Sequence, residues 1–485
     1  MSSNDSADFL SSTKPGNKEM DAVDKSIHAS LCYFILSGLA WLFVGSVLSV
    51  VGGLKLVDPS FLASFEFLTY GRMQAALNSS LIMGWVSNIV FAIALWIMAR
   101  LSAAPVSHGG VLLIAGVIWN VALTIGLLGI FTGGMTSLAW LDLPTYTSGI
   151  FLLSYSLIAV WGLVTFSNRK NNYSFASQWY IIGALLWFPW VYVIAQFFIL
   201  WFPVRGVIQS IIHAWYVNNI FYLWIAPIGL AVAYYLIPKI LGVPIRAYHM
   251  SFLAFWSFVF FSSWSGLFSL IGAPVPVWLV TVSIVSSISL IIPIIIFSYS
   301  ILGTLVSRLS EVLRDASLIF IAFGCFAFIE QLIVKVILSI RAIDSFTHFT
   351  LIYEGFDWHL IYGFFSMVAF GVLYHLIPQL LRQAWASRLL VKLHFILSSV
   401  GITLLVLALY IGGWIQGTQF NSPEVSFLTI VTELKFWIQL KSLGLILLLV
   451  ANSIFIINIF ATASKRLFSA LPILSIIKSG RADLN

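Results

Sequence analysis

Charged residues are scarce in this sequence. Aspartate, glutamate, lysine and arginine make up 8% of its 485 residues, whereas soluble domains carry roughly 25%. So few charges cannot cover a water-facing surface on a chain of this length, which excludes a soluble globule. Cys32 and Cys325 are the two cysteines, and both sit in apolar runs, so neither a disulfide framework nor a zinc site is expected. No lysine-rich stripe suggests a nucleic-acid partner.

Apolar residues, in contrast, make up 60% of the chain. Apolar stretches of about 20 residues recur, each long enough to cross the hydrocarbon core of a bilayer at about 1.5 Å per residue. The sequence therefore predicts an all-α integral membrane protein with about twelve transmembrane helices, embedded in the lipid bilayer. The predicted spans are 28–53, 75–100, 109–133, 146–167, 176–201, 212–238, 248–272, 276–302, 315–340, 357–381, 389–415 and 434–463.

The ends of the chain are more polar than its middle. Residues 1–26 lack an apolar run and are expected to form a cytoplasmic tail, residues 27–464 the membrane domain, and residues 465–485 a second cytoplasmic tail. Lysine and arginine concentrate in the tails and the even-numbered connections, which predicts that both termini are cytoplasmic. Pro238 and Pro378 are expected to end their helices at the membrane surface. We expect a multi-pass membrane protein.

Three short motifs carry a family resemblance. They read WYVNN at 215–219, YYLIPK at 234–239 and SIRAIDSFTH at 339–348. These segments, with their order and spacing, resemble catalytic subunit I of the cbb-type cytochrome c oxidases, the C-family of the haem–copper oxidases. The resemblance extends from about His28 to Thr462. It implies a twelve-helix fold with cytoplasmic termini, the topology predicted above from apolar runs and charge.

The resemblance also implies a low-spin haem, a high-spin haem and a copper ion, ligated by six histidines, for reducing oxygen and translocating protons. Here all six aligned positions carry other residues. Haem ligands of the family align with Asn78, Phe356 and Trp358, and its copper ligands align with Asn218, Phe268 and Ser269. An amide is a poor donor to iron or copper, and a hydrocarbon ring is none. We therefore expect no catalytic residue, haem or copper at these positions.

Four further residues are candidates for a function. Glu330 and Lys335 lie in the ninth predicted span, where ionisable side chains are costly, and their spacing puts them on different helix faces. His348 aligns with a family histidine that is not an axial ligand. His359 follows Trp358 and points about 100° away from it around the helix.

These observations predict a cytochrome c oxidase subunit I-like membrane protein that has lost its haem and copper ligands. Its expected role is structural or in assembly, within a respiratory electron-transport complex, beside cytochrome c-type or other oxidase subunits. One alternative is an active terminal oxidase-type subunit whose haem is held by His359 or His375. Another is a proton or small-solute conduit that uses Glu330 and Lys335. Whether the chain is an enzyme therefore stays open at this point.

Overall fold

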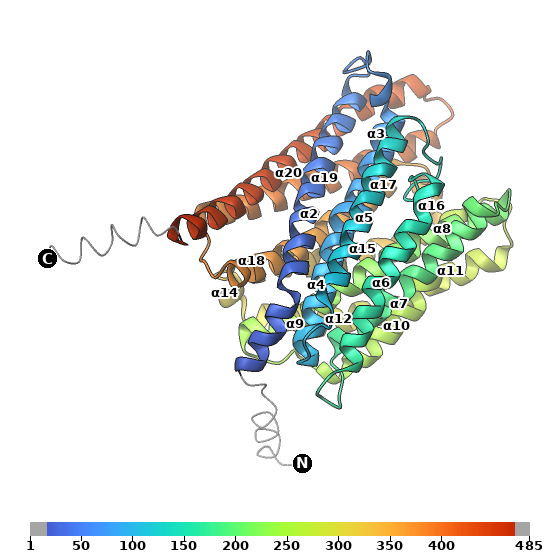
Figure 1. Ribbon diagram of the computed structural model, residues 1–485. Helices are drawn as coiled ribbons and strands as arrows, with labels where there is room; N and C mark the ends of the chain where they lie inside the picture. Colours follow the sequence, from blue (N-terminus) through green and yellow to red (C-terminus); the bar gives the residue numbers. More distant parts are fainter. Residues whose placement is uncertain (1–16, 471–485) are drawn as a thin grey trace.

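The computed structural model describes residues 17–470, and Figure 1 shows them as one bundle of long, tilted helices. The described part contains no strand, and twelve of its helical segments are long and apolar enough to span a membrane. The predicted fold class and number of spans are therefore confirmed. The spans are Met20–Val57, Tyr70–Ser102, Gly109–Phe131, Thr145–Ser167, Ala176–Trp201, Val207–Leu241, Tyr248–Leu270, Val277–Ser307, Ala316–Leu338, Leu351–Leu381, Arg388–Phe420 and Phe427–Arg466.

Most spans consist of one helix, and some are built from consecutive helices. The single-helix spans are α2 (Asn17–Val57), α5 (Gly109–Phe131), α6 (Ser148–Ser167), α7 (Ala176–Ala195), α10 (Ser251–Trp264), α15 (Ala316–Leu338), α19 (Arg388–Phe420) and α20 (Phe427–Ala470). The composite spans contain α3 (Tyr70–Ser79) and α4 (Ser87–Ser102), α8 (Val207–Asn219) and α9 (Ala226–Leu241), α11 (Val277–Ser289) to α13 (Gly303–Ser307), and α17 (Leu351–Trp358) and α18 (Met367–Leu381). Short helices α14 (Leu309–Val312) and α16 (Arg341–Thr347) lie in connections.

Three composite spans form the centre of the bundle. The most apolar stretches of the second, sixth and tenth spans are 100%, 94% and 94% buried, against 39–61% for the others. Each of the three has a π-helical segment in its middle, at Ser80–Val86, Ile220–Ile225 and His359–Ser366. Such segments are rare and occur often at functional sites. The residues aligned with family ligands in α3, α8 and α17 lie close to these segments.

Segments far apart in the sequence complete the outer layer. The first span packs against the last, so that α2 in blue lies beside α20 in red (Figure 1). Successive spans cross in opposite directions, and we call the surface at which α2 begins the near face and the other surface the far face. Connections 58–69, 132–144, 202–206, 271–276, 339–350 and 421–426 therefore lie at the far face.

Two expectations about helix ends need correction. The first helix begins at Asn17, not at residue 28, because residues 17–27 continue its helical hydrogen bonding. Residues 1–16 and 471–485, which include most of both predicted tails, lie outside the described residues. Pro238 and Pro378 lie inside α9 and α18, which continue to Leu241 and Leu381. Proline this close to a helix end is tolerated, and residues in the left-handed conformation, Gly242 and Arg382, end the two helices.

Candidate functional site

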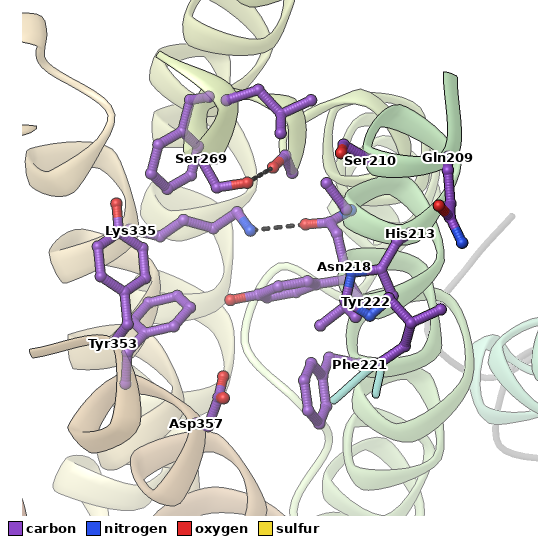
Figure 2. Close-up of a pocket in the computed structure, with 17 residues that line it drawn as sticks. Gln209, Ser210, His213, Asn218, Phe221, Tyr222, Ser269, Lys335, Tyr353 and Asp357 are labelled. Carbon is purple, nitrogen blue, oxygen red and sulfur yellow. Dashed lines mark hydrogen bonds between the residues drawn. The ribbon is translucent and has the colours of Figure 1, made fainter. Parts of the chain in front are cut away.

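A cavity of about 340 Å³ lies between the sixth, seventh, ninth and tenth spans (Figure 2). We call it the lysine pocket, after Lys335 of α15. Its lining includes residues beside the far-face connections, such as Leu138, Ser210, Leu270 and Tyr353, so it is open towards that face. Its full lining is Leu138, Gln209, Ser210, His213, Ala214, Val217, Asn218, Phe221, Tyr222, Gly266, Phe268, Ser269, Leu270, Lys335, Tyr353, Phe356 and Asp357.

Lys335 is 2% exposed and reaches into this pocket. Its Nζ donates a hydrogen bond of 2.8 Å to Oδ1 of Asn218, drawn in Figure 2. The same nitrogen lies 3.8 Å from the centre of the Tyr222 ring, and 5.9 Å and 5.8 Å from the rings of Phe268 and Phe356. Aromatic faces attract a cation at these distances. An amide oxygen and three aromatic rings thus surround the Lys335 nitrogen.

Asn218 is fixed by bonds on both ends of its amide. Its Nδ2 donates to the carbonyl of Ser262 at 2.7 Å, while its Oδ1 also receives the Ser265 hydroxyl at 3.4 Å. A side chain at Gly266 would place its Cβ 2.2 Å from Cβ of Asn218, so only glycine permits this approach. Ser269 donates to the Gly266 carbonyl at 2.9 Å. The structure thus brings Asn218, Phe268 and Ser269, the three residues predicted from the resemblance to align with copper ligands, to one pocket.

Asp357 is the acidic residue of the pocket lining. Its Oδ2 accepts a hydrogen bond of 3.2 Å from Nε1 of Trp140, which belongs to the far-face connection 132–144. The sequence predicted that the tenth span begins at residue 357, but α17 begins at Leu351 and Thr350 caps it. Asp357 instead faces the interior beside Phe356.

A second, far smaller cavity surrounds Asn78. We call it the Asn78 pocket; its volume is about 10 Å³, and Ser79, Asp142, Tyr192 and Gln196 are among its lining residues. This space is about that of a single water molecule. Asn78 accepts from Gln74 at 3.2 Å and donates to Oδ2 of Asp142 at 3.4 Å. Its amide is therefore used in a local hydrogen-bond chain.

Asp142 lies outside the spans, in the connection 132–144. Burial raises the pKa of its carboxyl from 3.8 to about 7, although hydrogen bonds from Asn78 and from the backbone N–H of Trp140 act in the opposite direction. Because Trp140 bonds Asp357 and the neighbouring Asp142 bonds Asn78, this one connection joins the two pockets. Trp140 adopts a positive φ of 66°, a strained conformation that the surrounding contacts have to maintain.

The other candidates lie elsewhere. Trp358 is buried at 8% exposure but is not part of the lysine-pocket lining, so of the tenth-span pair only Phe356 lies there. His348 bonds Asp344 at 3.3 Å in the far-face connection. The Glu330 side chain points outward, 3.9 Å from His359, and Lys335 points inward. The predicted opposite orientation of this pair therefore agrees with the geometry.

Sequence reasoning missed the partners that complete the two pockets. Tyr222, Trp140 and Asp142 were not among the candidates, although they contact Lys335, Asp357 and Asn78. A signal existed for Asp142, because an acidic residue within the apolar segment from Leu138 to Pro144 is unusual. For Tyr222 and Trp140 the signal was weak, since aromatic residues are common throughout this chain.

Comparison with known proteins agrees with this architecture. The chain shares 23% identity over 461 residues with cytochrome c oxidase subunit 1 of Rhodobacter capsulatus, covering 89% of this chain and 85% of that protein. It shares 20% identity over 405 residues with the cbb3-type cytochrome c oxidase subunit CcoN1 of Stutzerimonas stutzeri, covering 80% of this chain and 84% of that protein. A solved haem–copper terminal oxidase dimer has a chain of the same fold, with a TM-score of 0.72, 16% identity and coverage of 91% and 84%.

The fold and the spans thus define a multi-span helical membrane protein of the oxidase subunit I type. Residues 29–447 match the family of cytochrome c and quinol oxidase polypeptide I, and the chain belongs to that family. The resemblance seen in the sequence motifs is confirmed.

The interior residues do not fit the metal groups of the haem–copper oxidases. In the lysine pocket the Asn218 oxygen already accepts a hydrogen bond from the Lys335 amino group, and an amide oxygen is a weak donor to copper or iron. The Asn78 pocket holds about 10 Å³, whereas sites for drug-sized ligands occupy roughly 300–1,000 Å³. Within the described part, no group of three or more His, Cys, Asp or Glu side chains is arranged to hold a metal ion. We therefore derive no reaction step through haem or copper.

Proposed function

We propose that this chain is a cytochrome c oxidase subunit I-like component of a respiratory membrane complex that works without haem or copper of its own. The bond from Lys335 to Asn218 carries the proposal, because it engages the side chain at the position that the resemblance aligns with a family copper ligand. A buried lysine amino group is costly unless it is bonded, and here an amide oxygen bonds it and three rings surround it. The Asn218 oxygen is thus used in a bond within the protein.

The second pocket supports the same proposal by different means. The position aligned with a ligand of the low-spin haem is Asn78, and its hydrogen bonds go to Gln74 and Asp142. The surrounding side chains leave space for about one water. Losing a large cofactor would leave an unfavourable void unless neighbouring groups closed it.

The alternative with haem on other histidines gains no support from these contacts. Nδ1 of His359 bonds the Tyr410 hydroxyl at 3.2 Å, and Nε2 of His375 bonds Gln379 at 2.8 Å. Neither histidine lines the lysine pocket or the Asn78 pocket. A chain that keeps its scaffold without these metals retains the surfaces through which a membrane subunit contacts its neighbours, and this favours a role in assembly or stability of the complex.

Haem and metal analysis of the purified full-length chain tests the proposal. We expect the haem content, measured from the pyridine haemochrome spectrum, and the copper content both to be far below one per chain. The control is a haem–copper terminal oxidase produced in the same cells, which should carry both groups. Stoichiometric haem or copper would overturn the proposal. The variant Lys335→Met should also remain free of both groups, since Asn218 and Phe268 supply no imidazole.

A further inference from the structure

Glu330 places a carboxylate on the outside of the bundle at membrane depth. Its side chain is 56% exposed, and about 12 Å of helix separate it from Leu338, the far-face end of α15. His359 lies at a similar depth, about 12 Å from Leu351 in the tenth span. A charged side chain is costly in contact with lipid, so this carboxylate calls for a partner that compensates it.

The surroundings of Glu330 form a groove suited to a helix. A cavity of about 310 Å³ lies between α15, α19 and the π-helical segment His359–Ser366. We call it the Glu330 groove. Its lining includes the small residues Ala327 and Gly363 and the exposed Phe326 and Leu407. Both small residues are buried, so they lie at the floor of the groove and leave room for a side chain above them.

The inner wall of the groove is polar and already bonded. Nδ1 of His359 bonds the Tyr410 hydroxyl at 3.2 Å, which orients the ring. The other ring nitrogen is 3.9 Å from Oε2 of Glu330, too far for a hydrogen bond. The contact with His359 thus leaves the carboxylate able to accept a hydrogen bond from a donor arriving from the lipid side.

We propose that the Glu330 groove receives a transmembrane helix of a partner subunit, and that this helix carries a lysine or arginine side chain at the depth of Glu330. A cation compensates the exposed carboxylate, and the cavity has room for a long side chain beside the small residues. This inference extends the structural role proposed above, because it names a surface through which the chain would contact another subunit. It rests on that role only because it requires a partner in the membrane.

Photo-crosslinking of the full-length chain in the membranes of its own organism tests the groove. A photoreactive residue replaces Leu407, which is 49% exposed at the groove, or Val121, which is 51% exposed on α5 and serves as the matched control. We expect a protein adduct at position 407 and none at position 121. Mass spectrometry should map the adduct to a transmembrane segment of another chain that contains lysine or arginine.

Charge reversal tests the chemistry of the contact. Glu330→Lys should lower the adduct yield at position 407 about tenfold, as expected for the loss of an interhelical polar contact and a new repulsion. Reversing the cation on the mapped segment to glutamate should restore the yield in that variant. Ile333→Leu, on the same exposed face of α15, should leave the yield unchanged.

Several outcomes would overturn this proposal. These are adducts only with lipid or another small molecule, adducts with a second copy of this chain, a mapped segment without a cation, or a yield that Glu330→Lys does not change. Haem analysis is unaffected by any of them. Stoichiometric haem, in turn, would leave the crosslinks unchanged, so the two proposals fail separately.

Discussion

The lysine pocket and the Asn78 pocket lie in the same central bundle but differ in size and chemistry. The first is about 340 Å³ and contains the amino group of Lys335, whereas the second is about 10 Å³ and contains amides beside a buried carboxyl. In the small pocket Asn78 bonds Gln74 and Asp142, and little space remains. In the large pocket one amide oxygen and three rings surround the lysine nitrogen, and a cavity remains beside them. The comparison shows that one scaffold holds two polar pockets of very different size at its centre.

Rebuilding the ligand set would sharpen this comparison most. The side chains at positions 218 and 268 lie around the Lys335 nitrogen. A variant that combines Asn218→His, Phe268→His and Ser269→His with Lys335→Ala should therefore create a three-imidazole copper site. We expect copper to rise from near zero to about one per chain, measured after dialysis against copper, since three imidazoles with an open position form a stable site. Asn78→His should gain no metal. No copper in the combined variant, or equal copper in both, would contradict the contrast between the pockets.

The partner of Lys335 should matter more than its neighbour in sequence. Asn218→Leu keeps the side-chain shape but removes the bonds to Lys335, Ser262 and Ser265, so it should lower the free energy of unfolding by about 3 kcal/mol. Thermal unfolding in detergent measures the change. Asn219→Leu is the matched control; its amide donates to the Trp215 carbonyl at 2.8 Å and to the Ser263 carbonyl at 3.3 Å, and losing these bonds should cost about 1 kcal/mol. Equal losses would mean that Asn218 is an ordinary interhelical amide.

The smaller pocket should respond to pH through Asp142. Because its pKa is raised from 3.8 to about 7 by burial, the folded chain keeps the acid neutral where the unfolded chain ionises it. Its stabilising effect is complete below pH 3.8 and is lost as the pH rises to about 7. Between about pH 5 and about pH 7.5 the free energy of unfolding should therefore fall by roughly 2 kcal/mol.

Melting temperatures across that range test the effect. Asp142→Asn should flatten the decline, and Asp58→Asn, in the far-face connection 58–69 and exposed, should retain it. A decline that persists in Asp142→Asn would assign the pH dependence to another group.

The smallest effect concerns the ring under Lys335. Tyr222→Phe keeps the aromatic face and removes the hydroxyl that accepts a hydrogen bond of 2.6 Å from Gln331. We expect a loss of about 1 kcal/mol by thermal unfolding, whereas Tyr222→Leu also removes the face and should lose about 1–2 kcal/mol more. Equal losses in the two variants would show that the ring does not stabilise the cation.

Much of the fold was predictable because lipid imposes simple rules. Apolar runs of sufficient length predicted all twelve spans, as α15 illustrates, where the predicted 315–340 became Ala316–Leu338. The ends were less predictable. α2 begins at Asn17 in a polar segment, directly after the dipeptide Pro15-Gly16, a boundary signal that a search for apolar runs does not use. α9 continues past Pro238 and ends at Leu241, where Gly242 adopts the left-handed conformation.

The candidate site was predictable in its residues but not in its arrangement. Motif alignment selected Asn78, Asn218 and Phe356, and composition selected Lys335. Nothing in the sequence paired Lys335 with Asn218, since the two are 117 residues apart and the lysine side chain is long and flexible.

The sequence alone determined that the chain spans a membrane twelve times and resembles the oxidase subunits, because hydrophobic length and motif spacing are local properties. Only the tertiary structure decided that the large pocket contains Lys335 bonded to Asn218 and the small one contains Asp142 bonded to Asn78. That outcome depends on side chains from different spans and from one connection, whose distances are set when the whole bundle packs.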